Sequence, residues 1–179
     1  MRKEIAPQNI EGARITNKFG IFLKELFRLL GRHVIGNGIR VILYRCSGLS
    51  IGHHTQISGA LQIMDGAYIG LIKIGNYCAI SPRVSIAAGS SPPIFHPKMP
   101  PESYPVKFGK ITIEDGAWVG TGAVIMPGVT IGKHAIVGSN SVVAIDVPPY
   151  AIVAGSPAKQ ISWRNVSGEQ VYEAGEKID

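Results

Sequence analysis

The sequence predicts an all-β fold in which a short strand and a turn recur as one unit. Branched aliphatic residues occupy every sixth position of one stretch: Ile113, Val119, Ile125, Ile131, Val137 and Val143. Mostly small residues follow four positions after each of them: Ala117, Ala123, Val129, Ala135, Ser141 and Val147. A helix repeats its faces every 3.6 residues and a strand every 2, so neither alone explains two columns with a period of six.

The same spacing recurs earlier in the chain. It gives one column at Ile51, Ile57, Ile63 and Ile69 and, after a slip of one residue, another at Ile74, Ile80 and Ile86. The spacing from Ile86 to Ile113 is 27 residues, which six does not divide, and that interval contains six prolines. Because proline cannot donate a hydrogen bond to a strand ladder, residues 87–110 are expected to form an inserted loop. Long loops on a regular scaffold often carry function.

The 179 residues are interpreted as one domain in three parts. Residues 1–33 form an N-terminal segment with an amphipathic helix, residues 34–161 the repeats, and residues 162–179 a loosely packed tail, with room for a short helix. The helix has apolar residues at helical spacing, with Asn17 as N-cap and Gly31 as the stop: Phe19, Phe22, Leu23, Leu26, Phe27 and Leu30. Its apolar face is expected to cover the open end of the repeats, and peripheral membrane contact is the alternative.

Composition narrows the class of partner. The net charge of +6 favours anionic molecules, whereas the scattered basic residues argue against nucleic acid. The two cysteines, Cys46 and Cys78, fit neither a disulfide framework nor a metal motif, and Cys78 is expected to be buried. Without a signal peptide or a long apolar run, the expected location is the cytoplasm.

The hexads and the terminal segment VPPYAIVAGSPAK resemble the hexapeptide-repeat acyltransferases, in particular the sugar and exopolysaccharide O-acetyltransferases. The resemblance covers about residues 34–161. It implies a left-handed parallel β-helix with three hexads per coil, a homotrimer, acetyl-coenzyme A (acetyl-CoA) as co-substrate, and a sugar or lipid-linked glycan as acceptor.

Transfer of an acetyl group to a hydroxyl requires a general base, most often histidine. The family's histidine lies in the loop that follows the hexads of Ile80 and Ile86, but an alignment without gaps places Ser91 or Pro92 there. His96, followed by proline as in the family, lies four or five residues further along and is the predicted catalytic residue. The alternative is that the base is missing and the protein binds without catalysing.

Further site residues follow from the resemblance. It implies that Trp118, Thr121, Ser139 and Lys159 bind acetyl-CoA, with Lys159 and Arg164 near the nucleotide phosphates. The acceptor is expected to contact Asp65 and Tyr104, and Lys107 of the loop is a further candidate.

Three alternatives to sugar O-acetylation are compatible with the same fold. N-acetylation of an amino sugar would use the same base and donor, and a catalytically inactive member would act as a binding module or scaffold. Carbonic anhydrases of the gamma class share the fold but hold a metal with three histidines. Since this sequence has no convincing set of three, no metal site is predicted.

Overall fold

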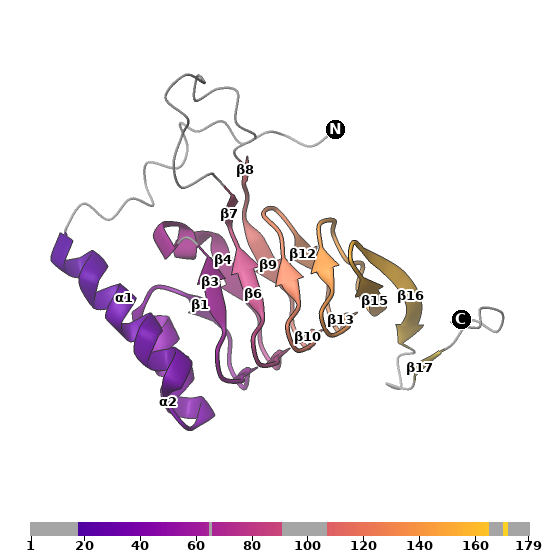
Figure 1. Ribbon diagram of the computed structural model, residues 1–179. Coiled ribbons are helices and arrows are strands. Elements are labelled where there is room, and N and C mark those ends of the chain that lie inside the picture. Colours follow the sequence, from indigo (N-terminus) through magenta and orange to yellow (C-terminus); the bar gives the residue numbers. More distant parts are fainter. Residues whose placement is uncertain (1–17, 65, 91–106, 165–169, 172–179) are drawn as a thin grey trace, which may run out of the picture.

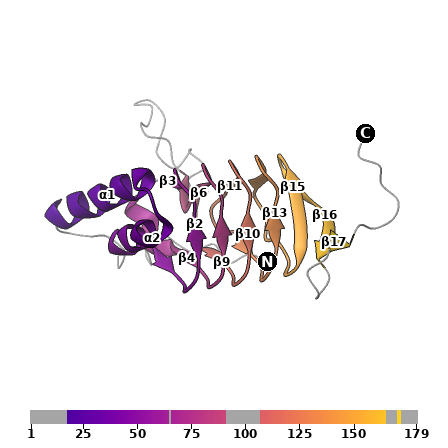
Figure 2. The ribbon, with the colours of Figure 1, turned by 90° about the horizontal axis from the view of Figure 1, so that it is seen from below.

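The computed structural model describes residues 18–64, 66–90, 107–164 and 170–171, and it is a three-sided coil of short strands with two helices at its N-terminal end (Figures 1 and 2). Each side of the coil is a parallel sheet. Face A contains β1 (Ser50–Ile51), β4 (Ile72–Ile74), β9 (Ile111–Ile113) and β12 (Thr130–Ile131). Face B contains β2 (Gln56–Ile57), β5 (Ala79–Ile80), β10 (Trp118–Val119), β13 (Ile136–Val137) and β15 (Ala151–Gly155). Face C contains β3 (Gln62–Met64), β6 (Ser85–Ala87), β11 (Val124–Ile125) and β14 (Val142–Val143).

The strand register defines the length of one coil. Thr112 of β9 aligns with Thr130 of β12, and Val124 aligns with Val142, so one regular coil takes 18 residues, or three hexads. Two coils are longer. Gln62 aligns with Ser85, so that coil has five residues more than the regular 18. Ser85 aligns with Val124, so the next coil has twenty-one more. The coil resumes in register after both insertions.

Both insertions leave the coil at the corner between face C and face A. The shorter one contains a 3-10 segment, η3 (Gly66–Leu71), and the longer one begins and ends with the antiparallel pair β7 (Gly89–Ser90) and β8 (Lys107–Phe108). The expected insertion near residues 87–110 is therefore present. Ile69 was predicted to continue the column of aliphatic residues, and this is wrong, because it is a buried residue of η3 that aligns with no strand.

The aliphatic column points into the coil and forms its core. All six residues from Ile113 to Val143 have an exposed fraction of 0%. The small residues fill the corners and are also buried, since Ala117, Ala123, Ala135 and Ser141 are likewise at 0%. A closed prism leaves room for one side chain per corner, which explains the requirement for small residues there.

Most corners have one residue with a left-handed backbone conformation directly before the small residue. Positive φ angles recur at six-residue intervals at Gly116, Gly122, Gly128, His134 and Asn140. Glycine has a second role directly after a buried aliphatic residue. A Cβ on Gly132 would lie 2.4 Å from the backbone nitrogen of Pro149 in the next coil, so only glycine allows that approach.

Two helices, α1 (Lys18–His33) and α2 (Asn37–Cys46), lie at the N-terminal end of the coil (Figure 2). The buried Tyr44 donates its hydroxyl to the Leu61 carbonyl at 3.0 Å, and Arg40 donates to the carbonyls of Gly31, Val34 and Ile57. These hydrogen bonds join α1, α2 and the first coil. Within the described residues, no helix has both the length and the apolar composition needed to cross a bilayer.

Three expectations about the ends of the coil and of α1 are wrong. The coil begins at Ser50, because residues 37–46 form α2. Gly31 does not end α1, which continues to His33, and its missing side chain allows close contact with the Tyr44 ring.

The third correction concerns the C-terminal boundary. The strand β16 (Ala158–Arg164) folds back along β15 and pairs with β17 (Gln170–Val171), so residues 162–164 and 170–171 lie in strands and not in a loose tail.

Candidate active site

Trp118 lies on the outer side of face B, where its indole is 49% exposed. Its Nε1 donates a hydrogen bond to Ser81 Oγ at 3.2 Å, which ties the indole to the neighbouring coil. Ser81 directly follows β5 and was not predicted from the sequence as a site residue. The pairing of β5 with β10, which are 39 residues apart in the sequence, would have indicated that Ser81 lies beside Trp118. This pairing can be deduced only once the length of the insertion is known.

Thr121 and Ser139 stand at equivalent positions of two successive coils, each two residues after a buried valine of face B. They lie in the turns that lead from face B to face C. The Asn140 N–H donates to the Thr121 carbonyl at 2.8 Å, which holds the two turns against each other. Ser139 is exposed and Thr121 is half-buried, so both present polar groups at the same edge of the prism.

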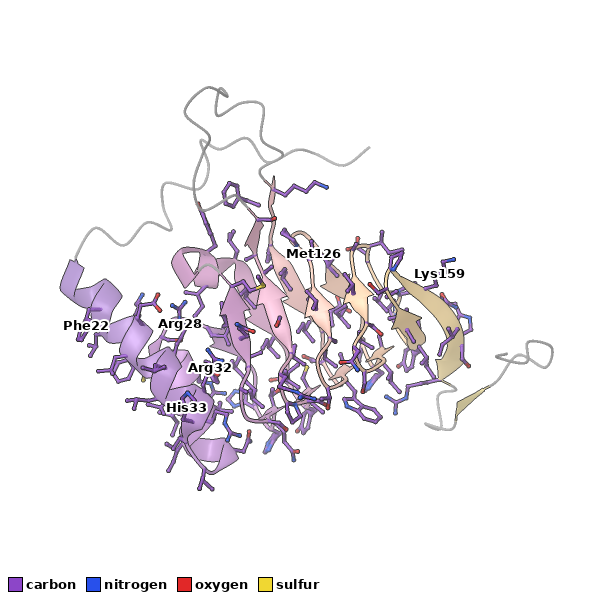
Figure 3. All side chains as sticks on the ribbon, in the orientation of Figure 1. Phe22, Arg28, Arg32, His33, Met126 and Lys159 are labelled. Atoms are coloured by element: carbon purple, nitrogen blue, oxygen red, sulfur yellow. The ribbon has the colours of Figure 1, made fainter. Side chains whose placement is uncertain are left out.

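Lys159 reaches the same edge from β16. Lys159 pairs with Ala154. Because Ala154 directly follows Val153, and Val153 aligns with Val137 of the preceding coil, Lys159 lies close to the turn that contains Ser139. Its side chain is exposed, and Figure 3 shows it on the outside of β16. Thr121, Ser139 and Lys159 are therefore arranged along the B-to-C edge, across the neighbouring strands β10, β13, β15 and β16, and the Trp118 indole lies on the adjoining outer surface of face B and reaches Ser81 near that edge. At about 4.8 Å per strand this edge is about 14 Å long, which suits an extended ligand.

Arg164 does not join Lys159. It stands at the other end of β16, where its Nη1 donates to the His134 carbonyl at 3.2 Å and its backbone N–H donates to the Tyr150 carbonyl at 2.8 Å. The expectation that these two cations act at one place is not met, because they lie near opposite edges of face B.

The predicted catalytic and acceptor residues, His96, Asp65 and Tyr104, lie outside the described residues. The structure does describe the segments that lead to them, and these segments meet at the C-to-A corner. Tyr68 of η3 and Phe108 of β8 place their rings 4.5 Å apart, so the two insertions contact each other at their base. Lys107 is exposed on β8.

A hollow of about 190 Å³ lies beside this corner, between α1 and the start of face C. It is lined by Glu25, Arg28, Leu29, Arg32, Tyr44, Leu61, Gln62 and Ile63. Arg28 forms an ion pair with Glu25 and lies against Gly66 of η3. Burial raises the pKa of Tyr44 to about 12, so its hydroxyl stays protonated and continues to donate to Leu61.

The corner between faces A and B holds polar groups that are already engaged in the fold. The backbone N–H of Asn76 donates to Asp115 Oδ1 at 2.7 Å, and this bond, with those from the Asn76 side chain, lowers the pKa of Asp115. His54 stacks on Tyr77 at 4.9 Å, and His134 contacts the Tyr150 ring at 5.2 Å.

Two further observations limit the chemistry that the described residues support. Cys78 is buried as predicted, and desolvation raises the pKa of its thiol, which disfavours the reactive thiolate. In the part of the chain that the structure describes, no three histidine, cysteine, aspartate or glutamate side chains come together as a metal site.

Comparison with known proteins identifies the family. Residues 110–144 match the family model for the bacterial transferase hexapeptide (six repeats). A chloramphenicol acetyltransferase of Klebsiella aerogenes is 35% identical over 166 residues, which cover 84% of this chain and 78% of the relative. The chain belongs to the hexapeptide-repeat acetyltransferase family.

Other members of this family match over different lengths. A galactoside O-acetyltransferase of Escherichia coli is 29% identical over 88% of this chain and 74% of its own. A putative acetyltransferase of Schizosaccharomyces pombe is 36% identical over 52% of this chain, but the match spans only 44% of that protein.

A crystal structure of a hexapeptide-repeat acetyltransferase from Vibrio cholerae superposes with a TM-score of 0.65 at 26% identity and covers 82% of this chain and 91% of that one. The complex of that protein with acetyl coenzyme A gives a TM-score of 0.61 at 27% identity, covering 89% and 91%. The family fold is the left-handed parallel β-helix that the resemblance implied.

Proposed function

We propose that this protein transfers the acetyl group of acetyl-CoA to a hydroxyl of a sugar or of a surface-polysaccharide precursor. Acetyl-CoA is the co-substrate of this acyltransferase, as predicted, and a solved relative has been crystallised with it. The observation that carries the proposal is the outer surface of face B, where the exposed Trp118 lies beside the B-to-C edge that carries Thr121, Ser139 and Lys159.

The chemistry of the donor suits this edge. An exposed indole offers a flat apolar surface to a pantetheine arm or an adenine ring, and the two hydroxyls offer hydrogen bonds. The Lys159 ammonium would interact with a phosphate group. Because the thioester already has a good leaving group, the enzyme needs to supply the base and the geometry.

The acceptor would bind where the two insertions meet. We assign the role of general base to His96, whose imidazole would take the proton from the attacking hydroxyl as the C–O bond forms and the C–S bond breaks. Asp65 and Tyr104 belong to the same two insertions and are proposed to position the acceptor. The contact between Tyr68 and Phe108 supports a shared site, because it fixes the bases of both insertions at one corner.

The donor edge and the acceptor corner flank face C on opposite sides. A homotrimer, proposed here from the family resemblance, would bring the edge of one subunit to the corner of its neighbour. O-acetylation is favoured over N-acetylation because relatives such as the galactoside O-acetyltransferase act on hydroxyls. Chloramphenicol should be included among the acceptors tested, given the chloramphenicol acetyltransferase of Klebsiella aerogenes.

The test is the release of coenzyme A from acetyl-CoA in the presence of neutral sugars, amino sugars, chloramphenicol and lipid-linked glycans. His96→Ala should lower kcat by about 10² to 10⁴, the usual contribution of a general base. His53→Ala is the matched control, since His53 is exposed near the corner between faces A and B and should be dispensable. Trp118→Ala should raise the KM for acetyl-CoA with a smaller effect on kcat.

Three outcomes would change the assignment. Equal turnover by wild type and His96→Ala would remove His96 as the base. Binding of acetyl-CoA without turnover of any acceptor would favour the non-catalytic binding protein, and acetylation of amino sugars alone would favour N-acetylation.

A further inference from the structure

The helix α1 turns its apolar side away from the rest of the described protein. Phe22, Leu26 and Leu29 share one side of the helix and have exposed fractions of 63%, 37% and 55%. Gly31, nine residues after Phe22 and so on the opposite side, makes the contact with Tyr44 of α2. In Figure 3, Phe22 projects away from the coil, whereas Arg28 and Arg32 project toward it. The expected arrangement, with the apolar face covering the end of the coil, is therefore not the one observed.

The second helix repeats the arrangement. Val41 and Tyr44 are its buried residues, while Ile39 and Ile42 are 56% and 58% exposed. Ile35, in the short connection between the helices, is 92% exposed. Two adjacent helices that each leave large apolar side chains in solvent indicate an interaction surface.

The charge of the chain is concentrated in the same segment. Between residues 18 and 46 lie six basic residues and one acidic residue, Glu25. The basic ones are Lys18, Lys24, Arg28, Arg32, Arg40 and Arg45. This segment therefore carries a formal charge of +5, out of +6 for the whole chain.

We propose that α1 and α2 bind the surface of an anionic phospholipid bilayer, with the apolar side chains inserted among the lipids and the net positive charge of the segment attracting it to the headgroups. A helix with Phe and Leu on one side and several cations on the other is suited to lie in the plane of the interface. An anionic surface is favoured over a second copy of this chain, because two copies would bring like charges of +5 together. This binding would hold the enzyme beside acceptors carried on a lipid, and it does not depend on the proposed acetyl transfer.

The test is co-sedimentation of the full chain with vesicles of phosphatidylcholine containing about 30 mol% phosphatidylglycerol, an anionic lipid. Wild type should bind these vesicles, bind neutral phosphatidylcholine vesicles much more weakly, and be released as the salt concentration rises. The double variant Phe22→Glu/Leu26→Glu should lose at least about tenfold in partition coefficient.

Ile145→Glu/Ile161→Glu is the matched control, because it introduces the same charge at two apolar residues that are 58% and 53% exposed on the coil and on β16. It should bind like wild type. Circular dichroism and sedimentation velocity on each variant establish whether fold and assembly are intact. Equal vesicle binding by Phe22→Glu/Leu26→Glu and wild type would overturn the proposal. The proposal would also be overturned if wild type did not bind vesicles and Phe22→Glu/Leu26→Glu changed the oligomeric state, because the surface would then join copies of this chain.

Discussion

The coil and the two N-terminal helices use apolar residues in opposite ways. In the coil, the aliphatic column from Ile113 to Val143 is completely buried, whereas on α1 the side chains of Phe22 and Leu29 are more than half exposed. Both patterns are regular in sequence. The coil closes on itself and leaves only one place for an aliphatic side chain, but a helix has a surface all round and needs a partner for its apolar side. A periodic apolar pattern therefore identifies buried residues only in a fold that encloses its own core.

The largest difference should come from truncating one apolar residue in each region. Ile125→Ala is expected to lower the free energy of unfolding by about 2 to 5 kcal/mol, since it leaves a cavity in a closed core. Phe22→Ala should change it by less than about 0.5 kcal/mol. Urea unfolding at one fixed protein concentration measures both. Similar losses for the two variants would mean that α1 has a buried apolar side in solution.

A second comparison uses glycine. Gly132→Ala should destabilise the protein by about 1 to 3 kcal/mol, because the new Cβ would lie 2.4 Å from the Pro149 nitrogen of the next coil. Gly38→Ala on α2 meets no atom within 4 Å and should stabilise it by about 0.5 to 1 kcal/mol through helix propensity. Thermal unfolding of both variants measures the two effects, and a neutral Gly132→Ala would show that the coils can separate at little cost.

The smallest expected effect lies where the two regions meet. Tyr44→Phe removes the hydrogen bond to the Leu61 carbonyl and should cost about 1 kcal/mol at neutral pH. Because the folded pKa of Tyr44 is about 12 and lies above its ordinary value of 10.0, wild type should keep this stability below pH 10 and lose it as the pH rises toward 12.

Denaturant titrations across that pH range check the sign, since the Tyr44→Phe variant should lack this component of the decline. The control is Tyr77→Phe, which changes a side chain that is 67% exposed and should follow wild type. A variant that declines as steeply as wild type would mean that Tyr44 titrates normally in the folded protein.

The period of six was sufficient to predict a repeated unit of strand and turn, and the resemblance added the three-sided coil. The sequence also identified the buried column, the small corner residues and the position of the long insertion, all of which the strand register supports. Ile69 was misassigned because it lies six residues after Ile63, although the insertion there is five residues long and the buried column resumes at Ile74. Residues 37–46 were assigned to the repeats because the resemblance was taken to begin at about residue 34, although Val41 and Tyr44 share the buried side of a helix.

The candidate site was predictable only in part. The resemblance named Trp118, Thr121, Ser139 and Lys159, and the register places the last three at the same edge of neighbouring strands, with Trp118 on the adjoining face. Arg164 looked equivalent to Lys159 in sequence, but β16 turns back along β15 and carries it to the opposite edge. The hexad spacing predicts neither the reversal of chain direction at β16 nor the hydrogen bond between Trp118 and Ser81.

The two insertions leave the prism at one corner, and the coil resumes its alignment after five additional residues as readily as after twenty-one. A change in the length or the sequence of either insertion would therefore leave the strand pairing of the coil unchanged. With the acceptor bound at this corner as proposed, changes in the two insertions would alter acceptor preference while the proposed donor site on face B stayed the same.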